Sequence, residues 1–295
     1  MEKQIRGVII GLTLTTIFAS STYAVLANQQ TDVQVKSESK VITTSPEEEK
    51  QTTIEIPTVQ IENEITTKQE AVYRMINAID YYHSIEIHFS ATKKAGELIE
   101  SIHLSAIHLS AINLSNNHLT KIDTTYSANN RSTLFYDNGN IETENFDSND
   151  KSLGIDTSFV MLEGASSNHS MTLADSIKIG DDGEKLYKAR PDANYYSNAK
   201  IVALPSDLAI NLLEDESIYE LTGTEKKAGR NTVVLEGSLS DANQVRYQSD
   251  HFKLNIDAKT GVLLGMSFTN NGIEKDYLNV SSVTFDQLPE VFKSN

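Results

Sequence analysis

The 295-residue sequence contains no cysteine and no tryptophan, and its acidic residues outnumber its basic ones. The absence of cysteine excludes disulfide bonds, thiolate metal sites, a cysteine nucleophile and lipid attachment at an N-terminal cysteine. The 25 Lys and Arg residues stand against 41 Asp and Glu, giving a formal net charge of −16. Nucleic-acid binding needs a basic surface that neutralises phosphates, so we predict no nucleic-acid partner.

Familiar catalytic signatures are also missing. The chain has no G-x-S-x-G, H-E-x-x-H, G-x-x-x-x-G-K-[ST] or G-x-G-x-x-G motif. Five histidines do gather in one third of the chain: His83, His88, His103, His108 and His118. The five-residue spacing among the last of them turns neighbours to opposite faces of a strand, which disfavours convergence on a metal ion. We therefore predict no enzyme, no cofactor and no metal site.

Residues 1–27 have the order of an export signal. Lys3 and Arg6 precede an uncharged apolar run, and small residues follow, with acceptable cleavage sites after Ala24 and Ala27. The alternative is an uncleaved membrane anchor, because residues 7–27 approach the roughly 20 residues that span a bilayer. In both cases we expect the remaining chain to lie outside the cytoplasm, secreted or tethered to the outer face of the cytoplasmic membrane. A cysteine-free exported chain favours a bacterial source.

Residues 28–66 are rich in Gln, Thr, Ser and Glu and contain no aromatic residue. Such a stretch buries too little surface to offset the entropy of ordering, so it is predicted to be a disordered acidic stalk. Thr67 and Glu70 then form a capping box that starts a helix running to about Tyr82. A second helix is predicted over 205–213, where Pro205 begins an apolar helical pattern.

The clearest strand pattern lies within residues 244–285. Apolar and polar residues alternate over 252–256 and over 262–268, with the turn sequence DAKTG between them. Asn271-Gly272 predicts a further hairpin, because both residues tolerate the positive φ of tight turns. This segment is therefore an antiparallel meander of three or four strands.

Residues 102–121 repeat every five residues, beginning with Ile102-His103-Leu104-Ser105-Ala106. This period fits neither a strand nor an α-helix, on which successive units rotate by roughly 140°. The pattern resembles the pentapeptide-repeat β-helix, but four units supply only one coil, whereas solenoids need several stacked repeats. We expect a local duplication that enlarges a strand–loop–strand region with irregular geometry, and a short β-helix remains the alternative.

Several short motifs follow one another in a specific order. Ala228-Gly229-Arg230 precedes a strand, Arg246-Tyr247 precedes the next, and that strand ends in Asp257-x-x-Thr260-Gly261. An Asn-Gly turn and a final Leu288-Pro289-Glu290-Val291-Phe292 complete the series. This order resembles the N-terminal domain of the periplasmic regulator RseB (MucB) and the wider superfamily of the lipoprotein carriers LolA and LolB.

The resemblance implies an α+β, mostly β fold over residues 67–295. It consists of a strongly curved antiparallel sheet, a half-barrel, covered by the N-terminal helix and by the helix near 205–213. Strand signals between 124 and 188, together with the strand at 231–237, raise the expected number to about ten or eleven.

The resemblance also implies a function, because LolA-like members carry lipoprotein acyl groups and RseB senses envelope-stress ligands and binds an anti-sigma factor. An apolar concave face would bind a lipid, a lipoprotein acyl chain or a hydrophobic peptide. The candidate cleft residues are Leu134, Tyr136, Phe159, Met161, Leu264, Met266 and Phe268. For each of them, ordinary core packing is the alternative.

Four residues at the motif positions are interpreted as structural: Arg230, Arg246, Asp257 and Gly261. Gly261 supplies a turn that needs positive φ, and Asp257 caps that turn. The chain ends shortly after the Leu288–Phe292 motif, without the second domain of RseB, which favours a carrier or sensor. The second hypothesis is a protein-interaction module that regulates a membrane-bound signalling protein in the manner of an anti-sigma-factor regulator.

Overall fold

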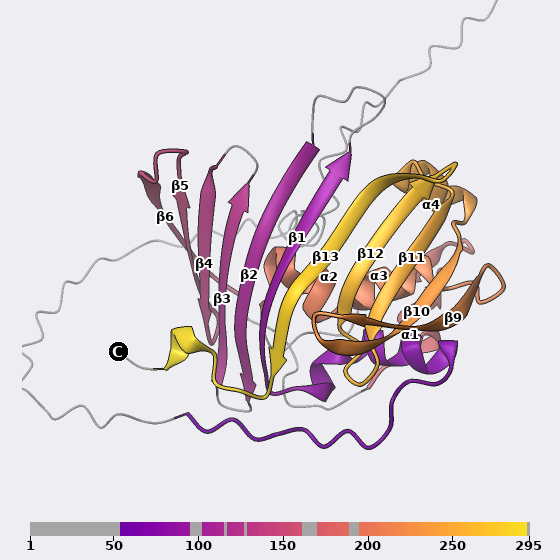
Figure 1. The fold of residues 1–295 in the computed structure, drawn as a ribbon, viewed down its shortest axis with the longest axis horizontal. Coiled ribbons are helices and arrows are strands. Elements are labelled where there is room, and N and C mark those ends of the chain that lie inside the picture. The colour runs from indigo at the N-terminus through magenta and orange to yellow at the C-terminus, as the bar shows by residue number, and fades with distance from the viewer. Residues whose placement is uncertain are drawn as a thin grey trace, which may run out of the picture. The chain divides into compact units, whose positions relative to one another are not determined.

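The computed structural model describes residues 54–94, 102–114, 117–126, 129–160, 170–188 and 195–293. Its main feature is an antiparallel sheet of eleven strands, in the order β6-β5-β4-β3-β2-β1-β13-β12-β11-β10-β9. The sheet is curved and open, as a half-barrel (Figure 1). The fold class and the expected number of strands are confirmed.

On either side of the central β1–β13 pair, strands that are consecutive in the chain are also neighbours in the sheet. They are β1 (Ser84–Lys94), β2 (Ile102–Leu114), β3 (Asn117–Tyr126), β4 (Arg131–Asp137), β5 (Asn140–Phe146), β6 (Ser152–Phe159), β9 (Tyr219–Lys227), β10 (Arg230–Ser238), β11 (His251–Asp257), β12 (Leu263–Asn270) and β13 (Ile273–Phe285). A separate two-stranded sheet pairs β7 (Ile177–Ile179) with β8 (Lys185–Tyr187).

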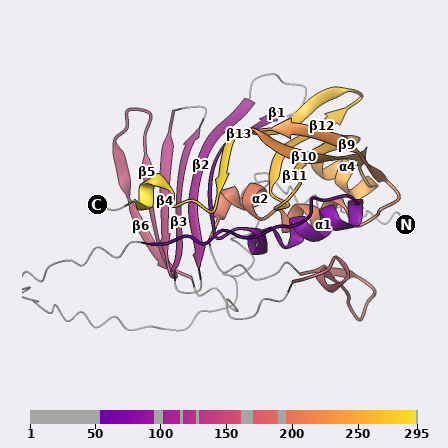
Figure 2. The ribbon, with the colours of Figure 1, turned by 60° about the horizontal axis from the view of Figure 1, so that its bottom comes forward.

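In the described ranges, four α-helices accompany the sheet: α1 (Lys68–Ile76), α2 (Lys200–Ala203), α3 (Ser206–Leu212) and α4 (Asp241–Tyr247). Figure 2 shows α1, α2 and α4 gathered on the side of the strands from β13 to β9. The Tyr82 hydroxyl donates to the Ala203 carbonyl of α2 at 2.9 Å, and the Tyr82 ring lies 5.6 Å from the Phe285 ring of β13. These contacts define a helix-covered face of the sheet.

The first helix begins where the capping box predicts. The Thr67 side chain accepts from the Glu70 N–H at 3.2 Å, and Glu70 accepts in return from the Thr66 N–H at 3.0 Å. The α-helix ends at Ile76, and a 3-10 turn follows over Ala78–Tyr81. The second predicted helix is present as α3, one residue shorter at each end than the predicted 205–213.

The strand register sorts side chains into two faces. A row on the helix-covered face joins neighbouring strands through Val283, Ile87, Leu109, Ile122, Leu134, Thr143 and Asp156. Residues one position away, such as His88 and His108, lie on the other side, the opposite face. The apolar members of the row form the centre of the core, since Ile87 and Leu109 are completely buried.

The pentad repeat forms part of two ordinary strands. β2 pairs with both β1 and β3 without any register shift, so the expected irregular geometry is wrong. Strict alternation turns Ile107 to the helix-covered face and Ile112 to the opposite face. Ile112 is nevertheless fully buried, and its register partner Ser84 donates to the Gln287 carbonyl at 2.6 Å. The chain after β13 covers this end of the opposite face, so isoleucine is tolerated on both sides of the strand.

Residues 54–66, expected to belong to the stalk, lie against the sheet domain. The Val59 N–H donates to Asp286 at 2.7 Å, and the Ile65 N–H donates to the Ala258 carbonyl at 2.8 Å. Ile65 is buried. The apolar residues spaced along this segment provide the contact surface that its overall composition did not reveal.

Residues 1–53 lie outside the described part of the chain, so the export segment and the rest of the stalk stay predictions. Within the described ranges, none of the helices has the length and apolar character that crossing a membrane requires.

Candidate functional site

The candidate cleft residues on β12 lie in a filled part of the helix-covered face. Met266 and Phe268 are register partners of Leu254 and Phe252 on β11, and Leu264, Met266 and Phe268 are all buried. Tyr247 of α4 stacks on Phe268 with 4.3 Å between ring centroids. Helix side chains therefore occupy the space that a ligand would need here, and these three residues act as core in this conformation.

The same face becomes less covered toward β6. Along the row defined above, Ile122 is buried, Leu134 and Thr143 are half-buried, and Asp156 is exposed. The apolar character of the row therefore continues past the helices as far as Leu134. Beyond it the row becomes polar.

Residues 195–199 provide the cover over β3 and β4. The ring of Tyr195 lies 6.0 Å from that of Tyr136, and Asn198 Nδ2 donates to Thr124 Oγ1 at 3.2 Å. Tyr136 is 3% exposed, and its burial raises the pKa of its hydroxyl. Leu134 and Tyr136 thus lie on the helix-covered face, at the border between covered and open sheet.

Phe159 does not join this group, which corrects its placement among the cleft residues. It pairs with Asn140 on the opposite face, and 61% of it is exposed. Its ring packs over Gly139, where an added Cβ would approach within 2.7 Å. Alternation within β6 shows which residues of that strand share a face with Phe159. It does not show whether that face is the one on which Leu134 lies. Met161 lies outside the described residues.

Three other apolar side chains are exposed on β4 and β6. Phe135 of β4 and Ile155 of β6 lie on the opposite face, and Leu153 is exposed beside the register shift of β6. β6 is also the last strand of the main sheet in the described part of the chain. This edge surface, made by Phe135, Leu153, Ile155 and Phe159, is a candidate protein-binding region.

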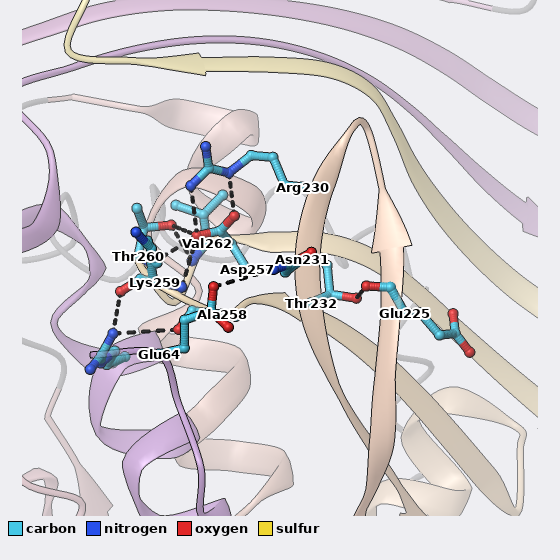
Figure 3. A network of polar contacts seen from close by, with 11 residues as sticks. Glu64, Glu225, Arg230, Asn231, Thr232, Asp257, Ala258, Lys259, Thr260 and Val262 are labelled. Atoms are coloured by element: carbon cyan, nitrogen blue, oxygen red, sulfur yellow. Dashed lines mark hydrogen bonds and ion pairs between the residues drawn. The ribbon is translucent and has the colours of Figure 1, made fainter. Parts of the chain in front are cut away.

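The motif residues Arg230 and Asp257 form a compact polar network (Figure 3). Arg230 Nε donates to Asp257 Oδ2, and the Arg230 guanidinium lies 4.7 Å from the Phe285 ring centroid. Asp257 Oδ1 also accepts from the N–H groups of Lys259 and Thr260, at 3.1 and 2.8 Å. The network fastens the turn after β11 to the β9–β10 hairpin.

The same turn is attached to α1. Arg74 Nη1 donates to the Lys259 carbonyl at 2.6 Å. Gly261 has φ +78°, and an added Cβ there would lie 2.4 Å from the Arg74 carbonyl group. Arg246, the fourth motif residue, is exposed in the last turn of α4. Arg230, Asp257 and Gly261 therefore organise the fold, whereas the structural role of Arg246 stays a prediction.

A cavity of about 340 Å³ lies beside this network. Its lining is Glu64, Ile65, Thr224, Glu225, Lys226, Asn231, Val233 and Ala258. Glu225 accepts from Lys253 Nζ at 2.6 Å and from Asn255 Nδ2 at 2.9 Å, and these bonds lower the pKa of its carboxyl group. A lining with three charged side chains suits a polar molecule better than an acyl chain.

No protein-family model and no curated protein matches the sequence. Among solved structures, the chain is similar to lipoprotein LppX of Mycobacterium tuberculosis, at 11% identity over 76% of this chain and 97% of that chain, with a TM-score of 0.38. LprF of Mycobacterium bovis is 10% identical over 78% and 99% of the two chains, with a TM-score of 0.36. A LolA superfamily protein of Nitrosomonas europaea is 9% identical over 78% and 99%, with a TM-score of 0.26. The last of these belongs to the superfamily that the sequence motifs resemble.

One cluster of potential metal-ligating side chains was not predicted from the sequence. Glu86 and His88 of β1 and His108 of β2 come together on the opposite face. The five-residue spacing relates only histidines within the repeat, whereas the His88–His108 pair forms across two strands. The Glu86-x-His88 alternation was the available signal, but it gains meaning only with the β1–β2 register.

Proposed function

We propose that the protein is a non-enzymatic binding protein of the cell envelope that holds a lipid, a lipoprotein acyl chain or a hydrophobic peptide, as carrier or sensor. The ligand lies on the helix-covered face at β3 to β5, beside residues 195–199. One observation carries this proposal: the apolar row of Leu109, Ile122 and Leu134 extends beyond the helices that bury the rest of the face.

An apolar chain gains free energy when it is buried at this border of the covered sheet. Each buried methylene contributes about 0.8 kcal/mol, so a few methylenes laid against the half-buried side chains of Leu134 and Tyr195 give measurable affinity. Residues 195–199 contact the sheet there through the Tyr195–Tyr136 ring contact and the Asn198–Thr124 hydrogen bond.

Two other regions are less suitable for such a ligand. The β12 part of the face is occupied by α4 and α2, with Phe268 fully stacked against Tyr247. The cavity beside the Arg230–Asp257 network is lined by charged groups. An acyl chain placed there would desolvate carboxylates and ammonium groups without pairing them.

The first experiment identifies the ligand class. The protein is purified from its native host in mild detergent-free buffer, and native mass spectrometry is followed by organic extraction and lipid analysis. The proposal predicts a co-purified lipid or acylated peptide at a defined stoichiometry. A clean protein mass, together with no uptake of a fluorescent fatty acid, would contradict it.

The edge surface supports a second candidate, an interaction module that regulates a membrane-bound signalling protein. Its exposed aromatic and aliphatic side chains lie next to the last strand of the sheet, where a partner strand can add by backbone hydrogen bonds. Crosslinking in cells with a photoreactive residue at position 155 tests this function. A membrane protein captured at 155 but not at exposed position 245 of α4 supports it, and identical capture at both positions counts against it.

A further inference from the structure

The opposite face carries a cluster of metal-ligating side chains at the centre of the sheet. His88 of β1 and His108 of β2 are direct register partners, and their rings stack with 3.8 Å between centroids and 18° between planes. Glu86 lies two residues before His88, hence on the same face, and its Oε1 is 3.1 Å from His108 Nε2. One ligand atom from each residue lies within 4.8 Å of the others.

We propose that Glu86, His88 and His108 bind a divalent transition-metal ion, with Zn²⁺ as the best-suited ion. Two imidazoles and one carboxylate are the donor set of three-ligand zinc sites, in which a fourth position stays open to water or another molecule. Hard cations such as Mg²⁺ and Ca²⁺ prefer sites made of oxygen ligands, so the two imidazoles select against them.

At least one imidazole must rotate out of the stack to reach coordination geometry, because the nitrogen lone pairs of two nearly parallel rings do not converge on one ion. Zn–N bonds of about 2.0–2.1 Å at a tetrahedral angle place two ligand atoms roughly 3.3 Å apart. The Glu86–His108 pair already has a separation of 3.1 Å. The remaining separations close by χ rotation of side chains that are exposed or half-buried on this face.

The scaffold favours a defined site. β1 and β2 are internal strands held on both sides, by β13 and β3, so the backbone positions of the three ligands are fixed. The Ser110 hydroxyl lies 3.3 Å from His108 Nε2, and Asp123 of β3 is the register partner of His108. Asp123 itself accepts from Thr133 Oγ1 at 2.7 Å and forms an ion pair with Lys121. Glu86 is therefore the carboxylate that contacts the His108 ring.

The test is a calorimetric Zn²⁺ titration of the metal-free protein and of His88→Ala and His108→Ala. His118→Ala is the control. His118 is a half-buried histidine on β3, and its ring bonds Asn113 of β2 and no member of the cluster. The proposal predicts a one-to-one site that weakens at least tenfold in each cluster variant and stays unchanged in the control. Unchanged affinity in both cluster variants, or an equal loss in His118→Ala, would overturn it.

Two further measurements separate loss of the metal site from loss of folding. Circular dichroism verifies that each variant folds, and Co²⁺ substitution reports tetrahedral coordination through its visible absorption. A second variant, Glu86→Gln, keeps the side-chain shape and is expected to weaken binding less than either histidine change. Because the cluster lies on the face away from Leu134, these variants leave lipid uptake unchanged, so failure of one proposal is distinguishable from failure of the other.

Discussion

Arg230 donates to the buried carboxylate of Asp257, which also accepts the backbone N–H groups of its own turn. The pair joins the β9–β10 hairpin to the end of β11, and 1% of Asp257 is exposed. Removing this carboxylate leaves the Arg230 guanidinium and the Lys259 and Thr260 N–H groups without their acceptor. We therefore expect Asp257→Ala to lower the free energy of unfolding by about 3 kcal/mol, measured by urea denaturation.

Arginine variants separate this pair from a general charge effect. Arg230→Ala is expected to cost about 2 kcal/mol, less than a fully buried pair, because the Arg230 side chain is 30% exposed. Arg246→Ala removes the same charge from an exposed helix position and should change stability by no more than about 0.5 kcal/mol. Equal effects of the two arginine variants would contradict the structural role of the Arg230–Asp257 pair.

Gly261 and Gly272 separate two costs of replacing a glycine. Both have a positive φ, but only Gly261 is also closely packed. Both have positive φ, +78° and +77°, but an added Cβ meets the Arg74 carbonyl at 2.4 Å at position 261 and nothing within 4 Å at position 272. Gly272→Ala should therefore cost about 1 kcal/mol from the left-handed conformation. Gly261→Ala must also displace α1 and should cost at least about 3 kcal/mol. Thermal denaturation of the two variants would refute this explanation if their Tm values fell equally.

The His88–His108 pair predicts a pH dependence of stability. The folded-state pKa of His88 lies below the unfolded value of 6.5, so the folded protein binds fewer protons at this site. The stabilisation is fully present above pH 6.5 and is lost as the pH falls below that value toward the folded pKa. The charged groups facing the pair are Glu86 on its own strand and Lys121 and Asp123 on β3.

His88→Gln isolates this contribution from the many carboxylates of the chain. The variant should lose less stability than the wild type between pH 7.5 and pH 5, as measured by urea denaturation at each pH. Zn²⁺ affinity of the wild type should fall over the same interval, because protons compete for the imidazoles. Parallel stability curves for wild type and variant would show that His88 has no role in the pH response.

Much of the fold follows from local patterns. The alternation over 252–256 and 262–268 predicts β11 and β12, and Thr67 with Glu70 predicts the start of α1. α4 escaped prediction because only Asn243 and Tyr247 of its seven residues are buried, which leaves almost no apolar periodicity. The contact of residues 54–66 with the sheet domain was not predicted for a related reason. Only a few spaced isoleucines of this polar segment are buried or half-buried.

The site was harder to predict, because it depends on register between strands. Alternation shows that Leu134 and Tyr136 share a face, but it cannot show that Phe159 lies on the other one. It cannot bring His88 to His108 either, because their 20-residue separation becomes a contact only through the pairing of β1 with β2. Nor does it show that α4 fills the face above Phe268.

The most direct test of lipid binding uses two neighbours on β4. Leu134 is half-buried on the helix-covered face, and Phe135 is exposed on the opposite face. Fluorescent fatty-acid uptake is measured for wild type, Leu134→Glu and Phe135→Glu, with folding checked by circular dichroism. We predict that Leu134→Glu weakens uptake at least tenfold while Phe135→Glu retains it. Equal uptake by all three folded proteins, or a loss confined to Phe135→Glu, would contradict ligand binding on the helix-covered face.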